Sequence, residues 1–219
     1  MKTCMIPQRL YPYFMKTGIQ KHYHKNDIIY MQGDEASHLY LITKGRVRVY
    51  TLSRDGKETT MEIVEKGRIF GESSFLQDVS RPTTVSAINE VEVISCSLES
   101  MLPCLSESKE LTLLLFQHLS NTNNHLSDLV NQAYFFNRYQ KVAYFLLEQT
   151  STPNIEKGIT TTCIPYTHEE IALCTGLHRV TITKILHEFQ DNGAISLSYR
   201  KVIIKDRAKL YDYLDCGKS

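Results

Sequence analysis

The sequence lacks a strong excess of charge of either sign. Its 219 residues include 25 lysines and arginines and 24 aspartates and glutamates, which gives a formal net charge of +1. So small a charge creates no global field that attracts a polyanion. A surface for nucleic acid would therefore have to come from local clustering of basic residues.

Long hydrophobic runs and a leader segment are also missing. No segment approaches the roughly 20 apolar residues that a membrane-spanning helix needs. The opening residues, MKTCMIPQRLYPYF, contain no apolar core of a signal peptide. We therefore expect a cytoplasmic protein that has no membrane partner.

Clustered cysteines are absent as well. The six cysteines stand at positions 4, 96, 104, 163, 174 and 216, and none forms a C-x-x-C pair or has the spacing of metal ligands. Free thiols in a reducing compartment are the expectation. A redox pair stays open as an alternative, although no spacing favours one.

The sequence has a β-strand pattern from about residue 20 to 98. Short runs rich in β-branched and aromatic residues, such as HLYLI and RVRVYTL, alternate with turn sequences. Glycines at positions 33, 45, 56 and 67 fall 12, 11 and 11 residues apart, and glycine readily adopts the positive φ that tight turns require. Regular turns between short strands predict a rolled-up antiparallel β-structure.

The pattern becomes helical near residue 98. Pro103 is expected to begin or end a helix. Beyond it, apolar residues recur at seven-residue intervals, which favours a long helix that pairs with a second copy through a coiled-coil seam. A long helix packed on its own domain is the alternative. The predicted seam contains Leu115, Leu119, Leu126, Leu129, Ala133 and Phe136.

The region after residue 159 has the pattern of a helix-turn-helix. Thr167 and Glu170 have the spacing of a capping box at a helix start, and Gly176 ends that helix in a tight turn. A second helix follows in LHRVTITKILHEFQDNG and ends at Gly193. Its apolar face is predicted to contain Ile182, Ile185, Leu186 and Phe189. Two helices joined in this way, the second with long polar side chains outside, fit the major groove of DNA.

A basic-tipped β-hairpin is predicted directly after these helices. Two short β runs in AISLSYRKVIIKD flank Tyr199, Arg200 and Lys201. From His178 to Arg207 six basic residues stand against three acidic ones, a local balance of +3 in a chain whose total is +1. This local clustering predicts contacts with DNA phosphates. A helical hairpin with a solvated basic face is the alternative.

Three stretches together resemble the superfamily of the cyclic AMP receptor protein and the fumarate and nitrate reduction regulator, the Crp/Fnr superfamily of bacterial transcription factors. They are IIYMQGDEASHLYLITKGRVRVYTLSRDGKE, FGESSFLQDVSRPTT and THEEIALCTGLHRVTITKILHEF, and they occur in the family's order. The resemblance implies an α+β fold: an N-terminal double-stranded β-roll in residues 1–106, a long dimerisation helix in 107–137 and a C-terminal winged helix-turn-helix in 138–219.

The same resemblance implies a function. It implies an effector-responsive regulator, not an enzyme, that binds a near-palindromic site in double-stranded DNA as a homodimer. RNA polymerase would be a further partner if the protein activates transcription.

The resemblance also implies an effector site in the β-roll. In members that bind cyclic nucleotides, the positions of Gly71 and Glu72 meet the ribose, and that of Arg81 pairs with the cyclic phosphate. Leu126 and Ser127 fall near the adenine-reading position on the long helix. The predicted effector set is Gly71, Glu72, Ser73, Arg81, Pro82, Thr83, Leu126 and Ser127.

Pro82 departs from the cyclic-nucleotide pattern. The family normally offers a backbone N–H at this position, and proline has none. A hydrogen bond to a charged group contributes about 1.5–3 kcal/mol. Its loss would therefore lower the affinity for a cyclic nucleotide about ten- to a hundredfold. We therefore expect a small anionic effector other than cyclic AMP and no required cofactor. A cyclic-AMP-responsive regulator is one alternative, and a Glu72–Arg81 salt bridge that only closes the roll is another. GLHRVTITKIL is also similar to the halogenated-phenol-responsive regulators.

In the DNA-binding region the resemblance assigns residues by position. Arg179, Val180 and Lys184 match base-reading positions of the second helix, and Thr167 and His168 match positions that touch phosphates. The predicted DNA-binding set is Thr167, His168, His178, Arg179, Val180, Thr181, Thr183, Lys184, Arg200 and Lys201.

A cupin-like metalloenzyme is the alternative from another class. His22 and His24 begin a cupin ligand motif, but no glutamate follows at the required place and the second histidine is missing. The sequence therefore predicts no bound metal. Haem bound through His22, His24 or Cys4 stays open, whereas an iron–sulfur cluster is rejected because Cys4 stands alone near the N-terminus. No arrangement of nucleophile, base and orienting group is recognisable, so no catalysis is expected.

Overall fold

The structure is a computed structural model and describes residues 5–72, 79–149 and 163–215. Two compact units are present, one covering Thr3–Asn124 and one from His125 onward. The boundary falls inside the long helix α3 (Lys109–Phe135). Within the described residues, no helix is long and apolar enough to cross a membrane.

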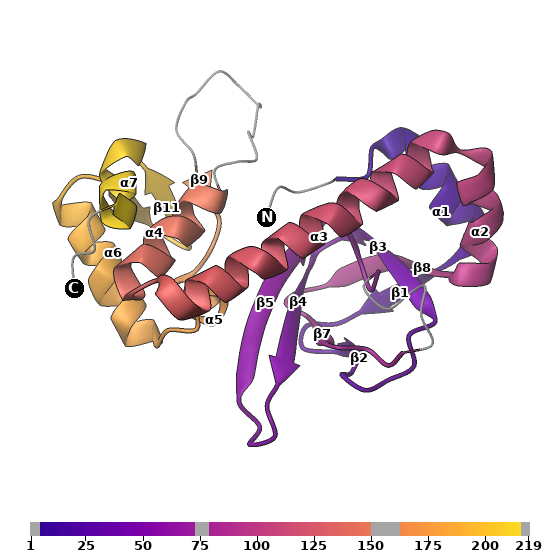
Figure 1. The fold of residues 1–219 in the computed structure, drawn as a ribbon, viewed down its shortest axis with the longest axis horizontal. Helices are drawn as coiled ribbons and strands as arrows, with labels where there is room; N and C mark the ends of the chain where they lie inside the picture. The colour runs from indigo at the N-terminus through magenta and orange to yellow at the C-terminus, as the bar shows by residue number, and fades with distance from the viewer. Residues whose placement is uncertain (1–4, 73–78, 150–162, 216–219) are drawn as a thin grey trace. The chain divides into compact units, whose positions relative to one another are not determined.

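The first unit is a β-roll of two four-stranded antiparallel sheets, preceded by a short helical segment (Figure 1). The sheet orders are β1-β8-β3-β6 and β2-β7-β4-β5. The elements are η1 (Gln8–Leu10), α1 (Tyr11–Thr17), β1 (Gly18–Tyr23), β2 (Ile28–Tyr30), β3 (His38–Lys44), β4 (Arg46–Leu52), β5 (Glu58–Glu65), β6 (Ile69–Phe70), β7 (Thr84–Ala87) and β8 (Val91–Ser97).

The predicted turns are confirmed. Gly33, Gly45, Gly56 and Gly67 all have positive φ, between 77° and 95°. At Gly45 a side chain would also collide with the chain, because an added Cβ would lie 2.2 Å from the carbonyl oxygen of Glu90. Glycine therefore lets the β3–β4 turn approach the turn before β8 closely.

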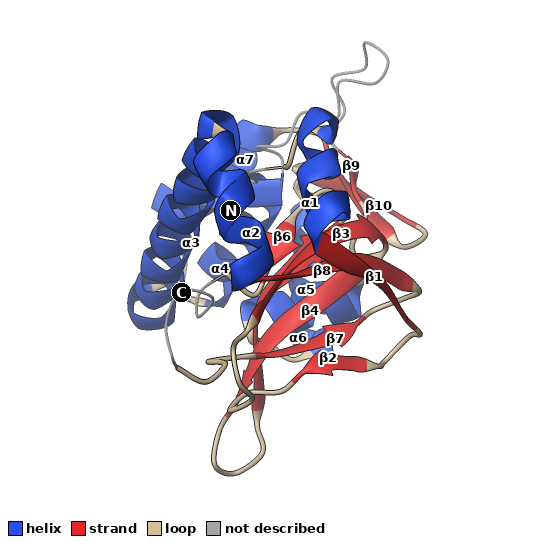
Figure 2. Cartoon of the chain, turned by 90° about the vertical axis from the view of Figure 1, so that its right-hand side faces the viewer, coloured by secondary structure: helices blue, strands red, loops and turns tan. Residues whose placement is uncertain are grey.

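Two separate hydrophobic cores lie on opposite sides of β3. Tyr40 and Ile42 pack inside the roll with residues of the second sheet, such as Val47 and Val85. Leu39 and Leu41 point the other way, into a core that also contains residues of α1 and of α2 (Leu98–Glu107). Figure 2 shows these two helices beside the β-roll. Because side chains alternate across a strand, neighbouring residues of β3 serve two different cores.

Helix α2 corrects the expectation about Pro103, which lies inside the helix and neither begins nor ends it. Ser97 caps the start of α2 by accepting a hydrogen bond from the backbone N–H of Ser100. Met101 and Cys104 are buried in the core that also contains Leu39 and Leu41. Tertiary packing on both sides of the proline therefore outweighs its local cost to the helix.

The second unit contains a winged helix-turn-helix. Its elements are α4 (Arg138–Gln149), β9 (Cys163–Ile164), α5 (His168–Thr175), α6 (Arg179–Asp191), β10 (Ile195–Ser198), β11 (Lys201–Ile204) and α7 (Arg207–Asp215). The three strands form one sheet in the order β10-β11-β9. With the β-roll and the long helix, this unit confirms the predicted α+β fold; α7 has no counterpart in the sequence analysis.

Candidate effector pocket and nucleic-acid interface

Arg81 is buried inside the roll, where only 3% of the residue is exposed. Its Nη1 donates a hydrogen bond to the carbonyl of Gly71 at 2.7 Å, and its Nη2 donates one to the carbonyl of His38 at 2.5 Å. The guanidinium carbon lies 4.3 Å from the centre of the Tyr30 ring and 5.9 Å from that of Tyr40. The protein's own carbonyls and aromatic rings therefore hold the positive charge in place.

Gly71 permits this arrangement. Its φ is +85°, and a Cβ there would lie 3.1 Å from Nη1 of Arg81 and 3.2 Å from the Tyr40 ring. Any larger residue would have to displace the guanidinium or the ring. Gly71 is therefore required by the packing around Arg81 as well as by its backbone conformation.

The side chain of Glu72 contacts α3. Its carboxylate accepts a hydrogen bond from the Thr122 hydroxyl at 3.2 Å and lies 3.5 Å from Nε2 of His118, a residue that is only 2% exposed. Burial would raise the pKa of the Glu72 carboxyl, but its interactions with His118 and Thr122 and a backbone hydrogen bond together hold that pKa below its ordinary value. Glu72 thus connects the roll to α3 as an anion.

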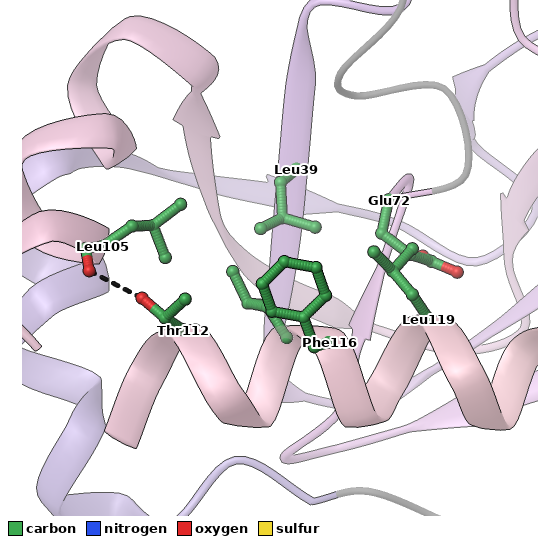
Figure 3. A pocket seen from close by; sticks show the side chains of 7 residues that line it. Leu39, Glu72, Leu105, Thr112, Phe116 and Leu119 are labelled. Carbon is green, nitrogen blue, oxygen red and sulfur yellow. Dashed lines mark hydrogen bonds between the residues drawn. The ribbon is translucent and has the colours of Figure 1, made fainter. Parts of the chain in front are cut away.

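A pocket of about 90 Å³ lies beside this carboxylate (Figure 3). Its lining is almost entirely apolar and comes from β3, α2, α3 and the segment after β6: Leu39, Glu72, Leu105, Thr112, Leu115, Phe116 and Leu119. Thr112 donates its hydroxyl proton to the carbonyl of Leu105 at 2.6 Å. Pockets that enclose a drug-sized ligand measure about 300–1,000 Å³, so this one is too small for a nucleotide.

The structure brings together only part of the predicted effector set. Gly71, Arg81 and Thr83 gather around Tyr30, whose hydroxyl is hydrogen-bonded to Thr83. Glu72 points to α3 instead, and Pro82 is exposed. Ser73 lies outside the described residues. Leu126 and Ser127 are exposed on α3 in the second unit, so their assignment stays a prediction.

Four further residues around this site were missed by the sequence analysis: Tyr30, Tyr40, His118 and Thr122. The two tyrosines lie on strands whose alternation was recognised, so their inward position could have been read from their register. His118 and Thr122 lie four residues apart on one helix face, but nothing in the sequence pairs that face with Glu72.

The exposed large apolar residues of α3 include Leu126 of the predicted seam and several residues outside it. Leu113, Phe116, Val130 and Tyr134 are between 56% and 80% exposed, and their spacing of 3, 14 and 4 residues is that of a heptad stripe. Leu115 and Leu119 are half-buried and line the pocket of their own unit. Phe136 packs on Tyr144, with ring centres 5.6 Å apart. Of the other predicted positions, Leu126 and Ala133 are exposed and Leu129 is half-buried.

The helix-turn-helix is built as its sequence predicts. The Thr167 hydroxyl accepts a hydrogen bond from the backbone N–H of Glu170, whose carboxylate accepts one from the backbone N–H of Thr167 at 2.7 Å. This capping box begins α5. Gly176 ends it in the left-handed conformation with φ +67°. The turn then leads directly into α6.

Helix α6 has a buried face and an exposed face. Ile182, Ile185, Leu186 and Phe189 are at most 2% exposed, which confirms the predicted apolar face. On the outside, His178, Arg179, Val180 and Lys184 are exposed, and Thr181 and Thr183 are half-buried. The available side chains therefore offer a fork of donors, a methyl surface and an ammonium group, which are the groups that read base edges and phosphates.

Contacts within the unit orient part of this surface. Nε of Arg179 lies 3.7 Å from a carboxylate oxygen of Glu169, and both side chains are mostly exposed. Nδ1 of His168 lies 3.1 Å from the Thr183 hydroxyl. Burial, with smaller contributions from His187 and Arg179, lowers the pKa of His168. A phosphate beside His168 would have to favour its protonated form against this environment.

The wing is a two-residue hairpin. Ser198 pairs with Lys201 across β10 and β11, so Tyr199 and Arg200 form the loop. Arg200 has φ +54°, and Tyr199 is 87% exposed. An aromatic ring and two cations thus project together from the tip, as the sequence predicts for a phosphate-contacting wing.

Comparison with known families matches both units. Residues 20–108 match the family model "Cyclic nucleotide-binding domain", and residues 140–213 match "Crp-like helix-turn-helix domain". The first model covers the β-roll and the second covers the winged helix-turn-helix, in the order in which these parts occur in the chain.

Individual proteins match over most of the chain. A CRP-like cAMP-activated global transcriptional regulator of Mycobacterium tuberculosis is 28% identical over 187 residues, covering 83% of this chain and 82% of that protein. A global nitrogen regulator of a Nostoc species is 26% identical over 187 residues, covering 83% of each chain. The structure of a CooA mutant from Carboxydothermus hydrogenoformans superposes with a TM-score of 0.80 at 22% identity, covering 96% of this chain and 95% of that one. With its roll, long helix and winged helix-turn-helix, the chain belongs to the Crp/Fnr superfamily of DNA-binding transcription regulators.

Proposed function

We propose that this protein is an effector-responsive regulator that binds a near-palindromic site in double-stranded DNA as a homodimer. The observation that carries the proposal is α6: its apolar face is buried, while Arg179, Val180 and Lys184 are exposed on the other side. Such a helix, set after a tight turn and followed by a basic wing, fits the major groove. The protein acts by binding and not by catalysis.

The DNA contacts divide into two kinds in this proposal. Arg179, Val180 and Lys184 reach base edges, with Thr181 and Thr183 beside them, and give sequence preference. Thr167, His168 and His178 at the helix starts, together with Arg200 and Lys201 of the wing, bind phosphates and fix the register. On binding DNA, Arg179 would give up its exposed ion pair with Glu169 and contact a base instead. Breaking this ion pair costs little free energy because exposed ion pairs are weak.

Assembly as a homodimer would use α3. The exposed stripe of Leu113, Phe116, Val130 and Tyr134 leaves a row of large apolar side chains in water, and a parallel copy of the same helix would cover it. A two-fold axis along this seam would present two recognition helices to two half-sites about one DNA turn apart. RNA polymerase is a further partner if the bound dimer activates transcription.

The effector in this proposal is a small anion that enters the β-roll at Arg81. The guanidinium beside Tyr30 and Tyr40 offers a fork of donors next to ring surface, which suits a carboxylate or phenolate on an aromatic body. The anion would replace the carbonyls of Gly71 and His38 as acceptors. An ionised oxygen forms a stronger hydrogen bond than a neutral carbonyl, and this gain has to offset the loss of Arg81 as a donor to those two carbonyls.

Cyclic AMP meets three obstacles as this effector, of which a smaller anion at Arg81 meets only the first. The terminal nitrogens of Arg81 already donate to two carbonyls, Glu72 is engaged with Thr122 and His118, and Pro82 offers no N–H. Cyclic AMP stays the second candidate because residues 20–108 match a cyclic nucleotide-binding domain and one relative is named as cAMP-activated.

In vitro selection of DNA sites by the full-length protein tests the core of the proposal. We expect an enriched near-palindrome with two half-sites about one turn apart. Small anions and aromatic acids would then be screened by thermal shift, and each hit added to the DNA-binding assay. Enrichment of no sequence, or of a single asymmetric half-site bound by a monomer, would contradict the proposal.

A further inference from the structure

Two histidines and one glutamate meet on the surface of the β-roll. His22 and His24 lie on the same side of the chain at the end of β1, and their ring centres are 5.1 Å apart. Nε2 of His22 lies 2.7 Å from a carboxylate oxygen of Glu90. Donor atoms of all three residues lie within 4.8 Å of one another. All three side chains are accessible to solvent.

We propose that His22, His24 and Glu90 form a binding site for a divalent transition-metal ion such as Zn²⁺. Ligand atoms about 2.0–2.2 Å from a tetrahedral zinc are about 3.4 Å from one another. The observed cluster reaches that spacing through small rotations of exposed side chains.

The donor set selects the class of metal. Two imidazoles and one carboxylate suit zinc, copper, nickel or cobalt, whereas magnesium and calcium prefer ligands made entirely of oxygen. Solvent access leaves room for water in the remaining coordination positions. Asp27 adds an orienting group, since its carboxylate lies 3.6 Å from Nδ1 of His24. Such carboxylates typically change metal affinity about 10- to 100-fold.

Backbone contacts hold both ligand-bearing segments in place. The carboxylate of Asp27 accepts a hydrogen bond from the backbone N–H of His24 at 2.8 Å, and the turn that follows His24 is bonded in both directions to Ala87 at the end of β7. On the other side, the Asn89 side chain accepts a hydrogen bond from the backbone N–H of Arg46 at 2.9 Å. The backbone that carries the three ligands is therefore fixed before any ion arrives.

A search for a cupin ligand motif along the sequence does not find this site. A cupin-type pattern expects its glutamate shortly after the histidines, whereas Glu90 is 68 residues further along the chain. It arrives because β1 pairs with β8, with His22 opposite Glu92 and Tyr23 opposite Val91. The proposed site therefore departs from the expectation of no bound metal that was drawn from the sequence.

A bound ion would link the edge strand β1 to the turn before β8. Any ligand that binds only the folded state raises its stability by mass action. The inference is independent of the proposed DNA-binding function, because the ligands lie in the β-roll and belong to none of the predicted DNA-contacting residues. The site would let metal concentration adjust the stability of the sensing unit.

Calorimetry on the chelator-treated full-length protein tests the site, using ZnCl₂, CoCl₂ and MgCl₂ separately. We expect one Zn²⁺ per chain, a thermal shift on saturation, and a visible Co²⁺ spectrum of low-coordinate N/O ligation. His22→Ala, His24→Ala and Glu90→Gln should each weaken Zn²⁺ binding at least tenfold, and Asp27→Asn should weaken it about tenfold. Glu92→Gln is the matched control, since Glu92 neighbours the site but is paired with Lys44 at 3.1 Å.

The variants should keep the wild-type circular dichroism spectrum, so that a loss of binding is not a loss of folding. Unchanged Zn²⁺ affinity in His22→Ala and His24→Ala would overturn the proposal. Absence of saturable Zn²⁺ binding at 1:1 stoichiometry in the wild type, or equal affinity for Mg²⁺, would overturn it as well.

Discussion

The polar groups around Arg81 and those on the outer face of α6 are arranged in opposite ways. Inside the roll, Arg81 is 3% exposed and its terminal nitrogens donate to two carbonyls of its own unit. On α6, Arg179 is largely exposed, and its ion pair with Glu169 lies at the surface. This difference implies that ligand binding at Arg81 would break hydrogen bonds within the protein, whereas DNA binding at α6 would break only an exposed ion pair. The side chains of α6 are available to DNA, whereas the effector proposed to bind at Arg81 would have to replace internal hydrogen bonds.

The largest effect is expected from the exposed stripe of α3, which belongs to neither of these two sites. Changing Phe116 and Val130 together to Asp would place like charges across the proposed two-fold axis and remove apolar contact. We expect the dimer to become monomeric at micromolar concentration by light scattering. The control is Gln117→Asp with Asn131→Asp, which has the same spacing at exposed positions next to the stripe. A dimer that survives the first pair, or is lost equally in both, would contradict the seam.

Truncating Arg81 tests the internal side of the comparison. Arg81→Ala leaves the buried carbonyls of Gly71 and His38 without these donors, and an unsatisfied buried group costs about 1–3 kcal/mol. We expect the free energy of unfolding to fall by about 3 kcal/mol or more, measured by urea denaturation of the full-length protein. Arg200→Ala, at the exposed wing tip, should change it by no more than about 0.5 kcal/mol. Equal effects of the two substitutions would remove the contrast.

Truncating Arg179 tests the external side. Arg179→Ala should cost about 1–3 kcal/mol on the selected DNA site through loss of a base contact, with unfolding unchanged. Lys201→Ala should instead weaken binding to all sequences alike and reduce the salt slope by about one unit. Fluorescence anisotropy with the selected site and a scrambled duplex measures both. An unchanged ratio of specific to nonspecific affinity in Arg179→Ala would show that α6 is misassigned.

Glu72 gives the smallest expected effect and a pH signature. Its folded pKa is held below its ordinary value, so ionised Glu72 stabilises the fold above its unfolded pKa of about 4.3, and that contribution disappears as pH falls through the folded pKa. We expect Glu72→Gln to lower the free energy of unfolding by about 1–2 kcal/mol at pH 7. The difference from wild type should shrink as the pH is lowered below about 4.

The exposed Glu107→Gln serves as the control for this pH series. It should follow the wild type at every pH. A Glu72→Gln variant that matches wild type at neutral pH would mean that the carboxylate stabilises nothing in its contact with α3.

Local chemistry explains which parts of the fold were predictable. Strand runs, the turn glycines with positive φ and the capping box of α5 are determined by neighbouring residues, and each appears where its sequence predicts. The apolar face of α6 follows from helical spacing alone. Pro103 was misjudged because burial of Met101 and Cys104 around it is a tertiary effect that no local pattern contains.

The candidate site was less predictable because it depends on where strands bring distant residues. Resemblance assigned Glu72 and Arg81 to one effector site, but it did not indicate that the Glu72 carboxylate contacts His118 and Thr122 of α3. Leu115 fits a heptad as well as Phe116 does, and only packing against the roll distinguishes them. The meeting of Glu90 with His22 likewise follows from strand pairing across 68 residues.

Calorimetry with cyclic AMP tests most directly the claim that the β-roll satisfies its own polar groups and is not a cyclic-nucleotide site. The account predicts weak or undetectable binding to the wild type. Pro82→Ser should strengthen binding about ten- to a hundredfold by restoring a backbone donor and adding a hydroxyl, and Pro82→Ala separates the contribution of the donor from that of the hydroxyl. Submicromolar binding of cyclic AMP by the wild type would contradict the account, because the hydrogen bonds of Arg81 to Gly71 and His38 would then pose no obstacle.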